Sequence, residues 1–552
     1  MSVLRWLGRL VIPLLVAAAL LVDARLEPAS STEEVEPPEL RTEVTVPPPD
    51  ALTSSWFCPV VSMRAVAVGR AEAAAELLLT NTTGVTASVS VELRGATTGR
   101  RFVMTEVPPR STQTLVASNY IDDELAGALV EASSGGLAVT RRFISPLGID
   151  EARCSSLLSE SWYAPGGDTQ VDALHSLAIM NPLPRDSIVD VAFATEAEFG
   201  PFVVPALKGL VVPAWSTIVI DVGEHARRRD VVATIVEART GRVAVDSFVA
   251  YDGTVGRRGF SAELATATPH ERWHLPVPGV DDHTRMWLRV LNPSDDVAEV
   301  EAEVITDGAN GDRLTFAVAS RDVIELVVEA PSARAPGLTT LLADPGMPFG
   351  LTVVSSNAIP IVVWVETLVG SAANPLTDLP NTSVRRQDDD PEQASRATTI
   401  VAQTDERSYD LDATQLEPEA DNSPNDAVPD ESSPAAPAAL IEPVLVARSG
   451  LAHVPGIGQA RLRWLTVIPS EAGSETVLMI QMDPSETSRR VVVGTLEAQT
   501  VAVIDVPPSG VATHRLASGT TRLLMSDTPF AASVWQAKAG GAGLSVAHPV
   551  GW

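Results

Sequence analysis

The sequence has 552 residues, of which 70 are acidic and 40 are Lys or Arg, and its formal net charge is −30. An acidic chain without a basic tract excludes nucleic acid as the expected partner. Two stretches without strand patterns hold much of this charge: 27–50 (seven acids, one Arg, net −6) and 371–440 (fifteen acids, four Arg, net −11).

The N-terminal segment 1–26 predicts export. Arg5 and Arg9 precede thirteen residues without a polar side chain, Leu10 to Val22. Such a run is short for a membrane span and typical of a signal peptide, so a cleaved signal and a retained anchor helix both remain open. Positive charge ahead of the run places the following residues outside the cytoplasmic membrane. The next stretch, 27–50, is rich in Pro and Glu and is expected to be a spacer.

A phrase that begins with tryptophan recurs along the chain. Trp56, Trp162 and Trp273 open WFCP, WYAP and WHLP, and each phrase is followed by an apolar run that ends in asparagine. A degenerate fourth copy reads HVP from His453, followed by LTVIP and by TVLMIQM from Thr476. A period near 105 residues corresponds to one β-sandwich per copy. We therefore predict an all-β fold of four tandem immunoglobulin-like β-sandwich repeats after an N-terminal signal or anchor helix.

The strands within each copy alternate apolar and polar residues, which is the period of a half-buried strand. Each copy closes with a hairpin whose second strand carries an aromatic residue, expected in one common column. These aromatics are Phe143, Phe248, Trp364 and Trp535. The predicted domains are a signal or anchor (1–26), a spacer (27–50), repeats at 51–155, 156–262, 263–370 and 441–552, and an acidic disordered linker (371–440).

The repeated tryptophans have two possible roles. Exposed indole faces could form a carbohydrate platform, which makes Trp56, Trp162 and Trp273 possible ligand residues. A structural role predicts a tryptophan in the same corner of every sandwich, and we favour this interpretation because buried aromatic residues contribute large apolar areas.

The two cysteines, Cys58 and Cys154, bracket the first repeat. Two cysteines alone cannot form a structural zinc site, and no histidine precedes His175 to activate a thiol. In an oxidising compartment we expect them to form one disulfide.

Sequence motifs for chemistry are nearly absent. The chain shows no nucleophile elbow, phosphate-binding loop or HExxH motif, so we predict no catalytic residues, no cofactor and no metal. The stretch PHERWHLPVPGVDDH from Pro269 gathers three histidines at spacings that match no metal motif, and we expect it to be an exposed linker.

The pattern W-[FY]-C-P, a second Cys, W-Y-x-P-G-G and LxxxNP resembles a family of uncharacterised secreted or membrane-anchored proteins of high-GC Gram-positive bacteria. Its residues here are Trp56, Phe57, Cys58, Pro59, Cys154, Trp162, Tyr163, Pro165, Gly166, Gly167, Asn181 and Pro182. The resemblance implies an envelope location and brings no catalytic residues.

We therefore expect an exported, non-enzymatic protein of the cell envelope that binds or scaffolds through a rod of tandem sandwiches. The expected partners are the cytoplasmic membrane, if the N-terminal helix is uncleaved, and an envelope polymer or envelope protein. The alternative is a carbohydrate-binding or carbohydrate-processing envelope protein with a site between repeats.

Overall fold

The computed structural model describes residues 44–63, 73–95, 97–123, 125–145, 147–196, 202–254, 257–281, 283–306, 311–329, 340–369, 450–455, 457, 460–468, 474–517, 519–538, 544–547 and 550–551. Strands make up 65% of the structure and helices 3%, which confirms the predicted all-β class. The predicted segments 1–26 and 371–440 lie outside the described residues, as does most of 27–50. Over the ranges just given, no helix is long and apolar enough to cross a membrane.

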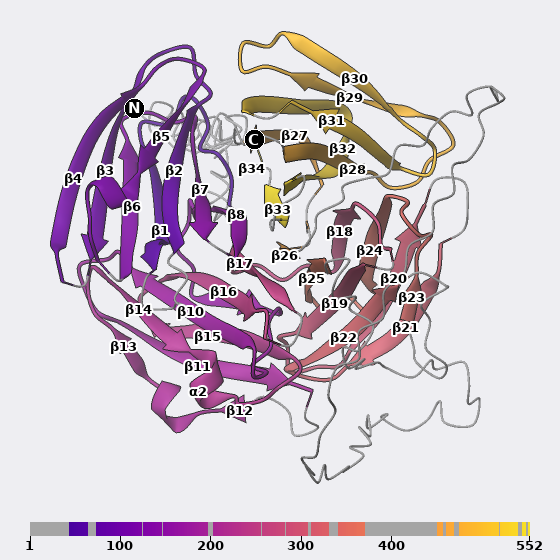
Figure 1. Cartoon of the computed structure of the whole chain (residues 1–552), viewed down its shortest axis with the longest axis horizontal. Coiled ribbons are helices and arrows are strands. Elements are labelled where there is room, and N and C mark those ends of the chain that lie inside the picture. The colour runs from indigo at the N-terminus through magenta and orange to yellow at the C-terminus, as the bar shows by residue number, and fades with distance from the viewer. Residues whose placement is uncertain are drawn as a thin grey trace, which may run out of the picture. The chain divides into compact units, whose positions relative to one another are not determined.

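One pattern of strand pairing occurs four times along the chain (Figure 1). We call each occurrence a set. In each set the strand that carries a tryptophan joins one antiparallel sheet, the tryptophan sheet. The next strand, which ends in asparagine in the first three sets, joins a second, mainly antiparallel group of strands, the asparagine sheet. In the second and third sets the two groups are separate sheets, as expected of a sandwich, whereas in the first and fourth sets strand pairs also join them into one sheet.

The first two sets contain seventeen strands and the described helices. Set one comprises β1 (Ser54–Met63), β2 (Ala73–Asn81), β3 (Ala87–Gly95), β4 (Gly99–Val107), β5 (Ser111–Val116), β6 (Leu125–Ala132), β7 (Leu137–Ser145) and β8 (Gly148–Arg153), with the 3-10 helix η2 (Ala117–Asn119). Set two comprises β9 (Ser161–Ala164), β10 (Ala173–Asn181), β11 (Ser187–Thr195), β12 (Phe202–Val203), β13 (Leu210–Val212), β14 (Ser216–Asp221), β15 (Val232–Thr240), β16 (Ala244–Asp252) and β17 (Arg258–Leu264), with η3 (Pro205–Leu207) and α2 (Val222–His225).

The last two sets follow the same pattern. Set three comprises β18 (Arg272–Val277), β19 (Thr284–Asn292), β20 (Ala298–Ile305), β21 (Arg313–Val318), β22 (Asp322–Glu329), β23 (Thr340–Leu342), β24 (Phe349–Ser355), β25 (Val362–Val369) and β26 (Gly450–Pro455). Set four comprises β27 (Arg461–Ile468), β28 (Ser474–Gln481), β29 (Arg489–Gly494), β30 (Thr500–Val506), β31 (Val511–Leu516), β32 (Thr520–Lys538), β33 (Leu544–Ala547) and β34 (Val550–Gly551).

Strand order is the same in all sets. The tryptophan sheets run β4-β3-β6-β1 in set one and β21-β20-β24-β18 in set three, while the asparagine sheets run β5-β2-β7-β8 and β14-β10-β16-β17 in sets one and two. The alternation that predicted strands is visible in β21, where Leu314, Phe316 and Val318 are buried and the residues between them are exposed. In set four the long strand β32 pairs in both sheets, because it covers both arms of the predicted hairpin.

The fourth copy differs from its predicted register. The counterpart of the repeated tryptophans is Trp464 on β27, and His453 instead lies on β26, which pairs with β25 as β8 pairs with β7. TVLMIQM is β28, which pairs like the asparagine strands and ends in Gln481. The stretch 370–449 is therefore inserted between two paired strands of set three, whereas we predicted a linker between repeats.

The hairpin aromatics are buried but do not form one column. Phe143 pairs with Ala75, six residues before Asn81, whereas Trp364 pairs with Arg289, three residues before Asn292. They lie instead at contacts between sets. Phe143 packs edge-on against Phe248 at 5.7 Å between ring centroids, and the Trp364 indole donates to Thr266 Oγ1 at 3.1 Å.

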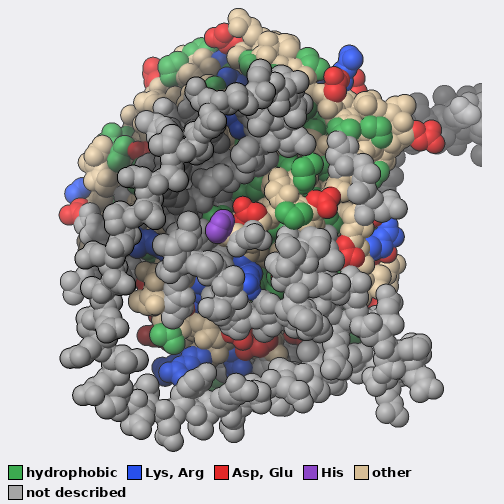
Figure 2. All heavy atoms as spheres, turned by 45° about the vertical axis from the view of Figure 1, so that its right-hand side comes forward, with side chains coloured by type: hydrophobic (Ala, Val, Ile, Leu, Met, Phe, Trp, Pro, Cys, Tyr) green, Lys and Arg blue, Asp and Glu red, His purple; other side chains and the backbone are tan. Residues whose placement is uncertain are grey.

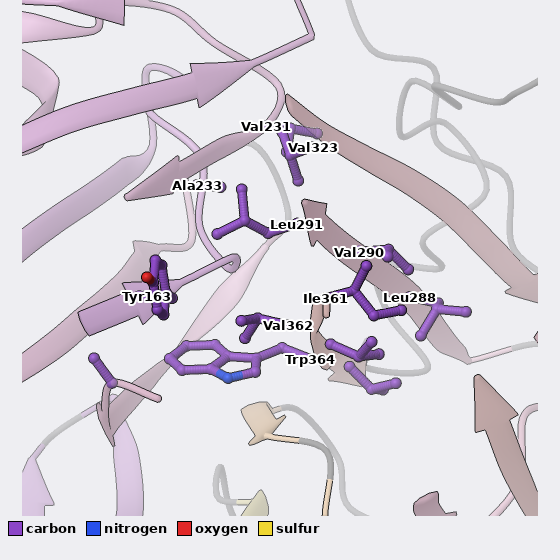
Figure 3. Packing of buried hydrophobic residues seen from close by; sticks show 14 of the residues in the cluster. Tyr163, Val231, Ala233, Leu288, Val290, Leu291, Val323, Ile361, Val362 and Trp364 are labelled. Carbon is purple, nitrogen blue, oxygen red and sulfur yellow. The ribbon is translucent and has the colours of Figure 1, made fainter. Parts of the chain in front are cut away.

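Apolar cores extend across the sets. One cluster includes residues of sets two and three together with Trp535 of set four. In Figure 3, Trp364 and Val362 from β25 extend toward Tyr163 from β9. A second cluster joins set one to Phe248 of set two and to Leu465 and Leu523 of set four.

The last strands of the four sets also meet. β8 contacts β17 and β33, and β26 contacts β17 and β33. Thr112 and Thr521, from sets one and four, share a hydrogen bond of 2.8 Å. The predicted rod does not account for these contacts, because it would separate the first set from the last.

A left-handed turn precedes the same strand in every set. Arg110, Trp215 and Arg321 have φ values of 51°, 60° and 53°, and Gly510 has 91°. They stand directly before β5, β14, β22 and β31. A side chain at such a position costs energy, so the turn must be held by its surroundings.

Candidate functional site

The repeated tryptophans are buried and bonded to the backbone. Trp56, Trp162 and Trp273 are at most 2% exposed. Their indole N–H groups donate to the carbonyls of Leu137, Val243 and Ile361 at 2.8 to 2.9 Å, and Trp464 donates to Phe530 in the same way at 2.7 Å. Each acceptor lies at the start of the hairpin's second strand or directly before it. These indole faces are not available to a sugar, so the carbohydrate platform on these residues is not supported.

The asparagines close the turn that follows their strand. Asn181 Nδ2 donates to the carbonyls of Arg185, Val212 and Pro213 at 2.8, 3.0 and 3.3 Å, and its Oδ1 accepts from Leu183 N at 3.0 Å. Asn81 and Asn292 make the corresponding bonds to their own loops. The motif residues that recur therefore satisfy main-chain groups.

The predicted disulfide is confirmed. Cys58 and Cys154 are bonded, with their Cα atoms 4.6 Å apart and a sequence separation of 96. Both are fully buried, beside the backbone bridge that joins Phe57 to Ser155. The bond ties β1 to the segment that follows β8.

A buried ion pair joins sets one and two. Arg141 on β7 binds both carboxylate oxygens of Asp246 on β16 and donates to the carbonyl of Val60 at 2.8 Å. Asp150 on β8 accepts from Ala262 N of β17 at 2.7 Å. Burial and the nearby Glu263 raise the pKa of Asp150 well above its usual range. Breaking such a pair leaves an uncompensated buried charge, so this contact fixes the position of one set against the next.

A larger polar network lies between sets two and three. The Tyr251 hydroxyl lies 2.7 Å from Asp168 Oδ2 and 2.8 Å from Glu366 Oε1. Arg257 stacks on the Tyr251 ring at 4.1 Å and binds Asp168 and Asp172. On the other side, Arg289 binds Glu366 and also Glu325 at 2.8 Å. We call these seven residues the Tyr251 network.

Burial is the largest cause of the raised pKa values of Asp168 and Tyr251 in the network. It raises the pKa of Asp168 against the opposing effect of Arg257. Burial, with Asp168 and Glu366 nearby, raises the pKa of Tyr251 well above its usual range. Their perturbed ionisation makes these groups candidates for chemistry, although structural ion-pair networks perturb pKa values in the same way.

The predicted histidine stretch is only partly exposed. β18 runs through it, and His274 is buried there with its pKa lowered by burial, which corrects the expectation of an exposed linker. Asp282 lies outside the described residues. Across those that the structure does describe, no group of three or more His, Cys, Asp or Glu side chains is placed to hold a metal ion.

The surface shows no dominant charge over the described residues of one face. Acidic and basic side chains are scattered there among apolar and uncharged ones (Figure 2). Exposed apolar side chains occur on the edge strands β4 and β30, including Phe102 and Met104. Trp215, at its left-handed turn in set two, stacks under Arg94 of set one at 4.3 Å.

Residues 147–329, from β8 to β22, are similar to a family of unknown function (DUF5719). No curated protein matches the sequence. The matched region contains Trp162, Trp273 and Asn181, and it contains Asp168 and Tyr251 of the network. It does not include Trp56 or Cys58.

The tryptophans and asparagines could be found from the sequence because they recur in each motif, and the cysteines because the chain has only two of them. Sequence reasoning missed the Tyr251 network. Asp168 follows the Gly166-Gly167 pair of the second motif, and a Cβ on Gly167 would clash with the His175 ring. Its partner Glu366, however, lies 198 residues further along the chain. No local pattern relates the two.

Proposed function

We propose that this chain is an exported, non-enzymatic protein of the cell envelope. In this proposal, four immunoglobulin-like β-sandwich repeats act as a scaffold that binds an envelope polymer or an envelope protein. The segment 1–26 directs export and is either cleaved or kept as a membrane anchor. We further propose that the resemblance to secreted proteins of high-GC Gram-positive bacteria extends over Trp56 and Cys58, outside the matched region.

The observation that carries the scaffold proposal is the role of the recurring residues. Tryptophan indoles and asparagine amides bind main-chain carbonyls inside each set, so what is repeated is a means of folding and not a ligand site. The junctions between sets are closed by buried side chains, as with Arg141 and Asp246. A disulfide in the first set supports an oxidising compartment.

Location can be tested by labelling. Both cysteines are bonded to each other, so the native chain offers no free thiol to a maleimide. Asn119, exposed in η2, is changed to cysteine, and intact cells are treated with a membrane-impermeant maleimide. We expect labelling in intact cells, with the unsubstituted chain unlabelled as the control. Labelling of Asn119→Cys only after lysis would contradict export.

Binding is tested with the purified full chain. We expect it to co-sediment with isolated envelope polymer, or to retain an envelope protein, without releasing new reducing ends. Release of reducing ends would support the carbohydrate-processing alternative. Variants Asp168→Asn and Glu366→Gln then serve as a check, because a catalytic role for these carboxyl groups requires that both abolish the release.

A further inference from the structure

The Tyr251 network has too few hydrogens if every carboxyl group is ionised. The hydroxyl of Tyr251 is within hydrogen-bonding distance of two carboxylate oxygens, at 2.7 Å and 2.8 Å. A phenol carries one hydrogen, and an ionised carboxylate only accepts. Two such contacts therefore require a second hydrogen, which one of the two carboxyl groups must carry.

We propose that Asp168 and Glu366 share one bound proton through Tyr251 at neutral pH, and that losing this proton loosens the contact between sets two and three. The pair binds the proton as a unit, so it is assigned to neither residue alone.

The charges around the pair are consistent with one retained proton. Among the described side chains, four carboxyl groups of the network, Asp168, Asp172, Glu325 and Glu366, bind two guanidinium groups, those of Arg257 and Arg289. The strand position opposite Glu366 on β26 is His453. Arg285 and Glu329 add one cation and one acid on the asparagine sheet of set three and leave this balance unchanged. A proton on the pair reduces the excess of buried negative charge by one.

The surroundings make a second ionised carboxylate costly. Tyr251 belongs to an apolar cluster with Val249, Trp287, Val327 and Leu368, and all five side chains are buried. Ionised groups in such a medium are strongly disfavoured unless each is paired, and here each guanidinium group is shared between two carboxyl groups. Burial is the largest cause of the raised pKa of Asp168, and it opposes ionisation of this carboxyl group.

The proton is coupled to the junction because the network spans it. Asp168 and Tyr251 belong to set two, while Glu366 lies on β25 of set three. The direction follows from linkage: a carboxyl group whose pKa is raised in the folded state stabilises that state at low pH. The stabilisation is lost as the pH rises through the folded value. The junction is therefore expected to weaken on the alkaline side.

The test is difference infrared spectroscopy on the full chain, which detects the C=O stretch of a protonated carboxyl group. At neutral pH, Asp168→Asn and Glu366→Gln should each remove the same single band from the wild-type spectrum. Asp190→Asn is the control, because Asp190 is an ionised carboxylate bound to Arg239 at 2.7 Å, outside the network. A spectrum in which neither network variant removes a band would overturn the shared proton.

Hydrogen exchange tests the coupling. Over the pH range above the ordinary carboxyl pKa in which the wild-type band is still present, the protection factors of β16 and β25 should fall by up to about tenfold per pH unit, as for one linked proton, and they should level off once the band is lost. Asp168→Asn should flatten this dependence. Protection that stays constant with rising pH over the range in which the band is still present would overturn the link to the junction. If one network variant does not fold, the band lost in the other still assigns the proton, and the wild-type protection profile is followed over the same pH range.

Discussion

Replacing Asn181 by alanine tests whether the recurring asparagine stabilises its set of strands. The amide group donates to three carbonyls and its oxygen accepts one N–H, and Asn181 itself is fully buried. Because Nδ2 carries two hydrogens, the substitution removes about three hydrogen bonds and leaves main-chain groups without partners. At about 1–1.5 kcal/mol for each bond, we expect a loss of about 3–5 kcal/mol in the free energy of unfolding.

The assay is urea unfolding followed by tryptophan fluorescence, with hydrogen exchange of β10 and β14 to localise the effect. Asn119→Ala is the matched control, since Asn119 is exposed. Asn181→Asp should be at least as destabilised as the alanine variant, because a carboxylate has no hydrogen to offer the carbonyls of Val212 and Pro213. The reasoning is refuted if Asn181→Ala lies within about 1 kcal/mol of the control, which is the range of ordinary surface changes.

Three further changes have defined outcomes. Replacing Cys58 and Cys154 together by serine should cost about 3–5 kcal/mol in the chain-entropy treatment of a long loop, measured by urea unfolding; a loss below about 1 kcal/mol would contradict it. Cleavage at a protease site engineered into 371–440 should leave two fragments that co-elute in size-exclusion chromatography, because β25 and β26 pair across the cut; separation without denaturant would contradict that pairing. Arg110→Gly should raise the free energy of unfolding by about 1 kcal/mol by relieving the left-handed backbone, whereas a loss would show that the arginine side chain stabilises the turn.

Much of the fold could be predicted because the copies repeat features of local sequence. Apolar alternation marks the strands, and the tryptophans Trp56, Trp162 and Trp273 recur 106 and 111 residues apart. The fourth copy was misaligned because Gln481 stands where the others have asparagine. Its side chain binds Leu351 O and Thr352 Oγ1 of set three instead of closing its own loop.

The pairing of distant strands could not be predicted in this way. Nothing in the composition of 450–455 indicates that it pairs with β25 across the stretch 370–449. The hydrogen bonds between strands join backbone groups, which are the same in almost every residue. The Tyr251 network could not be predicted from the sequence for a similar reason. Carboxyl groups look solvated in sequence, and only tertiary packing decides which become buried against one another.

The contact between the first and last sets limits how the number of sets in such a chain can change. Linear repeat arrays need terminal units with polar outer faces, because each unit covers only its neighbours. Here Leu465 and Leu523 of set four share an apolar cluster with set one, so the two terminal units cover each other. Losing or duplicating one unit would separate the two terminal units and expose the apolar side chains between them. Growth by duplication of a unit is therefore disfavoured. Extra sequence is accommodated within a unit, as with the stretch between β25 and β26.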